Sequence, residues 1–203
     1  MSFNYKIIIE YDGTDFVGWQ IQKNGRSVQE VIQKTIKKLI KENIILFGSG
    51  RTDAGVHAIG QTAHFITKFK IKDKNSFISS INFFLSKYNI SILNIEKKDL
   101  LFNARYSAKE RVYRYLILNR LGSLAINKNR VWHIKNKLDI NIMKKGAKLL
   151  EGTKDFSTFR ASSCGAKSPI RSMKKVKIIK KENLIEITFI AKSFLQQQVR
   201  SMV

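Results

Sequence analysis

The stretch GSGRTDAGVHAIGQTAHF, residues 48–65, holds three glycines in its first eight positions, two histidines and one carboxylate, Asp53. Asp53 is the only acid between Glu42 and Asp73, in a chain whose formal net charge is +23. No Gly-Lys-Ser/Thr follows, so the stretch is not a phosphate-binding P-loop. Asp53 stands where a dinucleotide fingerprint needs its third glycine. The pattern therefore predicts a tight glycine loop that presents a carboxylate.

Two structural alternatives remain open for this loop. Asp53 could simply cap a turn, as aspartates in glycine loops often do. Asp53, His57 and His64 could also bind a metal ion, although no Cys or Glu lies nearby to complete the ligand set.

The segments around the loop alternate between strand and helix patterns. Residues 3–11 are β-branched and alternating, which predicts a strand. A capping box at Ser27 and Glu30 opens a helix with an apolar stripe that runs to residue 40. Further strands are expected at 44–47, 61–67, 90–95 and 111–119, in a hairpin over 176–192 that turns at Glu182–Asn183, and further helices at 75–87, 139–150 and from about 194.

This order predicts an α+β fold made of two sheet-and-helix halves that meet at a basic cleft. The N-terminal half, residues 1–105, carries the glycine loop. The C-terminal half is expected over 106–203.

The composition favours a globular cytoplasmic protein with a polyanionic partner. The chain has 203 residues, 43% of them hydrophobic, and its apolar runs are too short to span a membrane. It shows no signal-peptide pattern, and its one cysteine, Cys164, is compatible with a reducing compartment. Lysine and arginine number 38 against 15 acids. Such an excess favours nucleic acid, although a lysine-rich composition accounts for part of it.

The arginines are more informative than the lysines, because a guanidinium can bind carboxylate or phosphate with two hydrogen bonds. Six of the ten fall in the motifs described below: Arg51, Arg105, Arg111, Arg114, Arg160 and Arg200.

The glycine motif closely resembles the signature of the TruA family of tRNA pseudouridine synthases. The resemblance extends over the whole chain and includes the strings YDGTDFVGWQIQ, SVQE, FNARYSAKERVYRY, DFSTFRASSC and FLQQQVRSMV. It implies that Asp53 is the nucleophile, that Tyr113 stacks on the target base, and that Arg51 and Arg200 belong to the substrate site. It also implies a homodimer that acts on tRNA uridines 38, 39 and 40 in the anticodon stem-loop, with no cofactor and no metal.

The chain departs from the family pattern at three places. Asn103 replaces a usual histidine, Ser86 replaces a usual proline, and the glutamines of QQQVR stand where histidines are common. None of these positions is Asp53, Arg51 or Tyr113, so the chemistry is expected to persist. Family members also continue for several tens of residues beyond the position of Val203, so the chain is expected to be naturally short or to lack its C-terminus.

The chemistry of the reaction is consistent with these residue types. Hydrolytic glycosidases use two carboxylates: one activates water or attacks the sugar, and the other protonates the leaving group. This motif offers only one carboxylate, Asp53. A neighbouring guanidinium, from Arg51 or Arg200, would favour the ionised carboxylate. The target base must be flipped out of its stem-loop and stacked on a flat side chain. Tyr113 suits that role between Arg111 and Arg114, although a strand tyrosine can equally face the core.

Two other classes of function remain open on the residues alone. One is a non-catalytic RNA-binding protein, against which the intact Arg51, Thr52 and Asp53 argue. The other is a metal-dependent nucleic-acid hydrolase, which the shortage of metal ligands disfavours.

Overall fold

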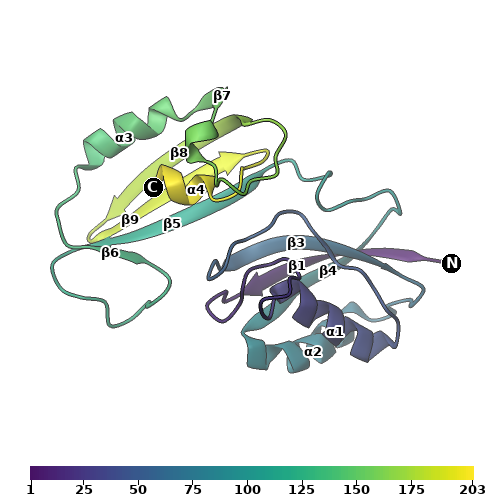
Figure 1. Cartoon of the computed structure of the whole chain (residues 1–203). Coiled ribbons are helices and arrows are strands. Elements are labelled where there is room, and N and C mark those ends of the chain that lie inside the picture. Colours follow the sequence, from purple (N-terminus) through teal and green to yellow (C-terminus); the bar gives the residue numbers. More distant parts are fainter. The chain divides into compact units, whose positions relative to one another are not determined.

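The computed structural model describes all 203 residues, which form two compact units, Met1–Ala108 and Lys109–Val203 (Figure 1). Each unit has its own sheet, its own helices and its own hydrophobic core. The two sheets with few helices confirm the predicted α+β class. Among the helices, none is both long and apolar enough to cross a lipid bilayer.

The first unit is a four-stranded antiparallel sheet in the order β2-β3-β1-β4, covered on one face by two helices (Figure 1). Its elements in chain order are β1 Phe3–Tyr11, α1 Val28–Ile40, β2 Phe47–Gly48, β3 Ala58–Thr67, α2 Lys74–Leu85, a 3₁₀ turn Ser86–Tyr88 and β4 Ile90–Lys98.

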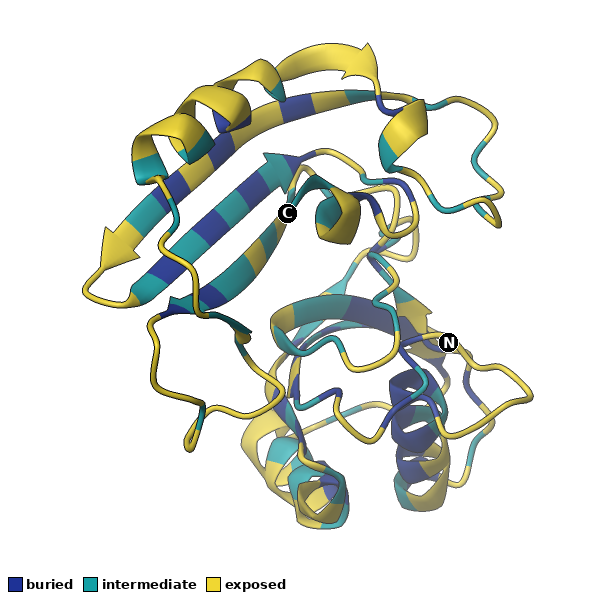
Figure 2. Cartoon of the chain, turned by 60° about the vertical axis from the view of Figure 1, so that its left-hand side comes forward, coloured by how far each residue is buried: buried dark blue, intermediate teal, exposed yellow.

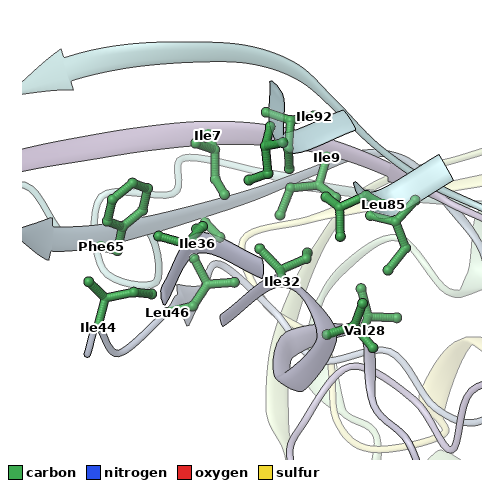
Figure 3. Packing of buried hydrophobic residues seen from close by; sticks show 14 of the residues in the cluster. Ile7, Ile9, Val28, Ile32, Ile36, Ile44, Leu46, Phe65, Leu85 and Ile92 are labelled. Atoms are coloured by element: carbon green, nitrogen blue, oxygen red, sulfur yellow. The ribbon is translucent and has the colours of Figure 1, made fainter. Parts of the chain in front are cut away.

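The core of this unit lies between the sheet and α1, as the alternation of β1 requires. Ile7 and Ile9 point from β1 toward Ile32 and Ile36 of α1, and all four are at most 1% exposed (Figure 3). Each fully buried side chain of this size contributes about 1.5–3 kcal/mol of transfer free energy. This packing fixes the sheet on which the glycine loop stands.

The start of α1 confirms the predicted helix cap. The Ser27 side chain accepts a hydrogen bond from the Glu30 backbone N–H, and the buried face of the helix is the predicted apolar stripe. The helix ends at Lys41, whose backbone is left-handed with φ 58°.

The prediction of a strand at 44–47 was wrong for its first three residues. Only Phe47 and Gly48 join the sheet, where they pair with His64 and Ala63. Side chains of α1 take over the backbone groups of Leu46 instead: Gln33 Oε1 accepts its N–H at 2.9 Å and Gln29 Nε2 donates to its carbonyl at 2.7 Å. The short β2 delivers the chain directly into the glycine loop.

The second unit is a five-stranded sheet in the order β6-β5-β9-β8-β7. Its elements are β5 Arg111–Asn119, β6 Trp132–Ile134, α3 Ile140–Leu149, β7 Gly152–Asp155, a 3₁₀ turn Ser157–Phe159, β8 Ile170–Lys181, β9 Leu184–Ala191 and α4 Gln198–Met202. The central strand β9 alternates between buried and half-buried residues (Figure 2).

The β8–β9 hairpin confirms the predicted turn. Lys181 pairs with Leu184, and Glu182 adopts a left-handed conformation with φ 52° between them. Two strands were not predicted. β6 has only three residues. β7 is a fully exposed polar segment, Gly-Thr-Lys-Asp, and it forms a strand by antiparallel pairing with β8.

Candidate active site in the first unit

The glycine loop, residues 49–57, leaves the sheet after β2 and rejoins it at β3. Its entry is fixed by β3: the Ser49 N–H donates to the Thr62 carbonyl at 2.8 Å. Gln61 of β3 then holds both sides of the first turn. Its Nε2 donates to the Gly50 carbonyl at 2.7 Å, and its Oε1 accepts from Ser49 Oγ at 3.1 Å.

A second loop, residues 12–19, supports the glycine loop along its middle. The Trp19 N–H donates to the Thr52 carbonyl at 3.0 Å, and the Gly55 N–H donates to the Phe16 carbonyl at 3.3 Å. The buried Tyr11 hydroxyl lies 2.7 Å from Thr52 Oγ1. Backbone groups on both sides of Asp53, at Thr52 and Gly55, are therefore hydrogen-bonded to the 12–19 loop.

Glycines allow this close approach of the two loops. A Cβ atom at Gly13 would lie 2.1 Å from the Val56 carbonyl oxygen. At Gly18, where φ is +115°, it would lie 2.6 Å from the Thr52 carbonyl oxygen. Real Cβ atoms essentially never come within 3.0 Å of another heavy atom. Only glycine lets the 12–19 loop pack this tightly against the residues on either side of Asp53.

Asp53 itself is half-buried. Its backbone carbonyl accepts the Val56 N–H at 3.2 Å, which closes the turn. Asp12 differs, because its carboxylate Oδ1 accepts from the backbone N–H and the hydroxyl of Thr14 at 3.0 and 2.6 Å. The bond that closes the Asp53 turn thus involves its backbone carbonyl. Arg51, two residues earlier, is exposed.

The two histidines of the motif have separate structural surroundings. His57 Nδ1 lies 3.0 Å from the Gly13 N–H and 3.1 Å from Asp12 Oδ1, so it joins the two loops. His64 is buried and stacks on Phe47, and its Nδ1 accepts the Ala104 N–H at 3.1 Å. Burial lowers the pKa of His64 below its ordinary value.

The alternative metal site needs Asp53, His57 and His64 together. Across the 203 residues, no group of three or more histidine, cysteine, aspartate or glutamate side chains lies close enough to hold a metal ion.

Tyr113 lies on β5 in the second unit. It is half-buried against the core of that unit, and its ring meets Phe194 edge to face at a centroid distance of 5.0 Å. Arg111 donates to the Lys192 carbonyl, and Arg114 lies 3.7 Å from Glu186 in an exposed ion pair. The ring therefore has both a packing partner and partial access to solvent.

Arg200 is exposed on the short helix α4. Just before it, the buried Gln198 accepts the Leu195 N–H at 2.8 Å, which fixes the start of the helix. Its predicted pairing with Asp53 stays a prediction.

The departures from the family pattern have local structural roles. Asn103 Oδ1 accepts the N–H groups of Arg105 and Tyr106 at 3.0 and 3.3 Å and so makes a turn. Ser86 ends α2, and its hydroxyl donates to the Phe83 carbonyl at 3.1 Å. These contacts explain how the fold accommodates the unusual residues.

Comparison with known proteins gives one consistent result. The sequence profile of the family described as tRNA pseudouridine synthase matches residues 7–107 and 147–203. The chain is 58% identical over 201 residues to tRNA pseudouridine synthase A of Pelagibacter ubique (strain HTCC1062), covering 99% of this chain and 82% of the relative. It is 45% identical over 202 residues to the protein of the same name from Ehrlichia canis (strain Jake), covering 98% of this chain and 81% of the relative.

Proposed function

Because the chain belongs to the tRNA pseudouridine synthase family, and so is an isomerase that acts on tRNA, we propose that Asp53 is the nucleophile of its reaction. Membership confirms the resemblance drawn from the motifs. It also decides against a purely RNA-binding protein and against a metal-dependent hydrolase. The observation that carries the proposal is the packing of the 12–19 loop against the glycine loop on both sides of Asp53.

The reaction breaks the bond from uracil N1 to ribose C1′ and makes a bond from C5 to C1′. In the proposed route, the Asp53 carboxylate attacks C1′ and the base leaves with the electron pair of the broken bond. The base then turns, C5 attacks C1′, and Asp53 is released as carboxylate. The C5 proton departs and N1 gains a proton, so atoms and charge balance.

The geometry of the first unit suits this route. A nucleophile must be held close to its target in a fixed orientation, and misplacement by about 1 Å can cost roughly a hundredfold in rate. Hydrogen bonds at Thr52 and Gly55 hold the backbone immediately around Asp53 to the 12–19 loop. The half-buried position lets a flipped nucleotide reach the carboxylate while limiting access of water.

Three further residues are proposed to complete the site. Arg51 and Arg200 would supply positive charge, which keeps a carboxylate ionised when substrate excludes water. Tyr113 would stack on the flipped base, since its partly accessible ring provides a flat face. This assignment requires a basic cleft to which both units contribute, and it rests on the family motifs.

We further propose that the substrate uridines are those at positions 38, 39 and 40 of the anticodon stem-loop, and that the protein is a cytoplasmic homodimer. The substrate positions and the dimer rest on the motif resemblance. The single cysteine suits a reducing compartment. Sedimentation equilibrium tests the dimer, and a monomer at micromolar concentration would contradict it.

The function is tested with tRNA carrying tritium at C5 of its uridines. Purified protein, with chelator and no cofactor, should release tritium to water at a rate proportional to enzyme. tRNAs with uridine at only one of positions 38, 39 and 40 assign the release to a site. Absence of release from every tRNA by the folded protein would contradict the proposal.

A further inference from the structure

A groove of about 260 Å³ lies on the helix side of the first unit, and none of the site residues assigned above lines it. It is bordered by α1 and by the end of α2 with its 3₁₀ turn. Its lining combines cations with aromatic rings: Arg26, Lys34, Lys38 and Lys87, with Phe84 and Tyr88. We call it the α1 groove.

The charge of the α1 groove is strongly positive. Its only acid is Glu30, which pairs with Lys34 at 2.6 Å. The lysines continue beyond the groove, because Lys34 and Lys38 also line an adjoining depression with Lys37 and Lys41. Lys34 and Lys41 are seven residues apart, and at a rise of about 1.5 Å per residue the lysines follow about 10 Å of helix. Together with Arg26 and Lys87 across the groove, they can contact more than one phosphate of a nucleic-acid strand.

Aromatic rings hold the cations of the groove in place. Lys38 Nζ lies 4.2 Å from the centre of the Phe84 ring, and Lys87 Nζ lies 5.0 Å from that of Tyr88. Arg26 lies 5.2 Å from the same tyrosine ring. Such contacts restrict side chains that would otherwise move freely, so less entropy is lost when an anion binds. An ordinary solvated lysine face has no such ordering.

The groove is connected to the candidate active site through the 12–19 loop. Arg26 also lies 5.6 Å from the ring of Phe16, whose carbonyl accepts the Gly55 N–H from the glycine loop. The Arg26 carbonyl in turn accepts the Val17 N–H. Phe16 of the 12–19 loop thus contacts Arg26 of the groove with its ring and Gly55, two residues after Asp53, with its backbone carbonyl.

We propose that the α1 groove binds the sugar–phosphate backbone of the tRNA substrate outside the anticodon stem-loop. We expect the groove to bind phosphates and not bases, because cations already lie over the Phe84 and Tyr88 rings. The ring faces are therefore not free for a base to stack on, whereas the ordered positive charges can bind phosphate. Phosphate contacts carry little sequence information, so the groove positions many tRNAs alike. This inference rests on the proposed function, because it takes tRNA as the ligand.

The test compares two triple variants that each remove three positive charges from exposed helical surfaces. Lys34→Gln, Lys38→Gln and Lys87→Gln together empty the groove of lysines. Lys144→Gln, Lys145→Gln and Lys148→Gln make the matched change on α3. Glutamine keeps helix propensity close to that of lysine. Thermal unfolding confirms that both variants are folded.

Affinity is measured for full-length tRNA and for an isolated anticodon stem-loop over a series of salt concentrations. The groove variant should bind full-length tRNA at least about tenfold more weakly, with a salt slope lower by roughly 0.9 for each phosphate that the lysines no longer neutralise. The groove variant should lose clearly less affinity for the isolated stem-loop than for full-length tRNA. The α3 variant should lose clearly less affinity for full-length tRNA than the groove variant does.

Three results would overturn the inference. Equal decreases for the groove and α3 variants would mean that only net charge matters. Equal decreases for full-length tRNA and for the stem-loop, or no decrease at all, would mean that the groove does not contact RNA outside the stem-loop. Tritium release by the wild-type protein is measured in parallel, because its absence would contradict the proposed function and not the groove alone.

Discussion

Replacing Gly13 by alanine tests whether the 12–19 loop positions the candidate nucleophile. The added Cβ would lie 2.1 Å from the Val56 carbonyl oxygen and 2.6 Å from the carbonyl carbon, where at least 3.0 Å is normal. These atoms are backbone, so no flexible side chain can rotate away. The two loops must therefore separate by about 1 Å, which moves the turn that contains Asp53.

This separation should affect both the unfolding free energy and kcat. Forcing an extra carbon into a packed contact costs about 1–3 kcal/mol of unfolding free energy. A displacement of about 1 Å at the nucleophile should lower kcat roughly a hundredfold. The affinity for tRNA should change little, because the substitution adds no charge and removes none.

The assay is tritium release from C5-labelled tRNA at saturating substrate, together with urea unfolding and a tRNA binding curve. Gly60→Ala is the matched control, since nothing lies within 4 Å of its added Cβ and the residue is exposed on β3. It should retain the wild-type rate. A Gly13→Ala protein that turned over within threefold of wild type would refute the idea that this contact positions Asp53.

Three further predictions concern other residues. Tyr113→Phe should keep tRNA affinity while Tyr113→Leu loses about 1–3 kcal/mol of binding free energy, because stacking needs a flat ring; equal, wild-type affinity of the two folded variants in a filter-binding assay would assign Tyr113 to the core. Arg200→Ala should lower the rate of tritium release at saturating tRNA, because the Asp53 site loses a positive charge, and Arg200→Lys should give an intermediate rate, because lysine restores the charge without the guanidinium geometry; a wild-type rate with weaker tRNA binding would make Arg200 a phosphate contact instead. Burial lowers the pKa of His64, so the unfolded chain binds a proton at this residue at a higher pH than the folded chain does. The contribution of His64 to the unfolding free energy should therefore be complete above about pH 6.5 and decline as the pH falls below that value. Urea unfolding at pH 7 and pH 5 should show a smaller decline for His64→Gln than for His133→Gln, and equal declines would contradict this.

Local signals in the sequence were sufficient for much of the fold. Ser27 and the apolar stripe predicted α1, and the alternating faces of residues 111–119 predicted both ends of β5 correctly. The Glu182–Asn183 turn fixed the β8–β9 register. In each case the signal lies within a few residues of the element that it determines.

The errors concern structure that depends on distant partners. Leu46 was expected in a strand, but Gln29 and Gln33 of α1 take its backbone hydrogen bonds. The exposed strand β7 carries no apolar alternation, and its existence depends on pairing with β8. No local pattern could have revealed either arrangement.

The candidate site shows the same division. Asp53 and the glycines of its own loop stand out in the sequence, and the motif resemblance added Tyr113, Arg51 and Arg200. The supporting contacts of Gln61 and Gly13 were missed. The only available signal for Gly13 was its place in the string YDGTDFVGW, because the close approach to Val56 joins residues 43 positions apart.

The most direct test of the role of Asp53 is a single-turnover measurement with the Asp53→Asn variant. Asparagine keeps the size and shape of the side chain but cannot act as the nucleophile at C1′. With enzyme in excess over C5-tritiated tRNA, the variant should bind the tRNA at least as tightly as wild type and release no tritium above background, a loss of many orders of magnitude in rate. Tritium release by Asp53→Asn at a measurable fraction of the wild-type rate would contradict the assignment of Asp53 as the nucleophile.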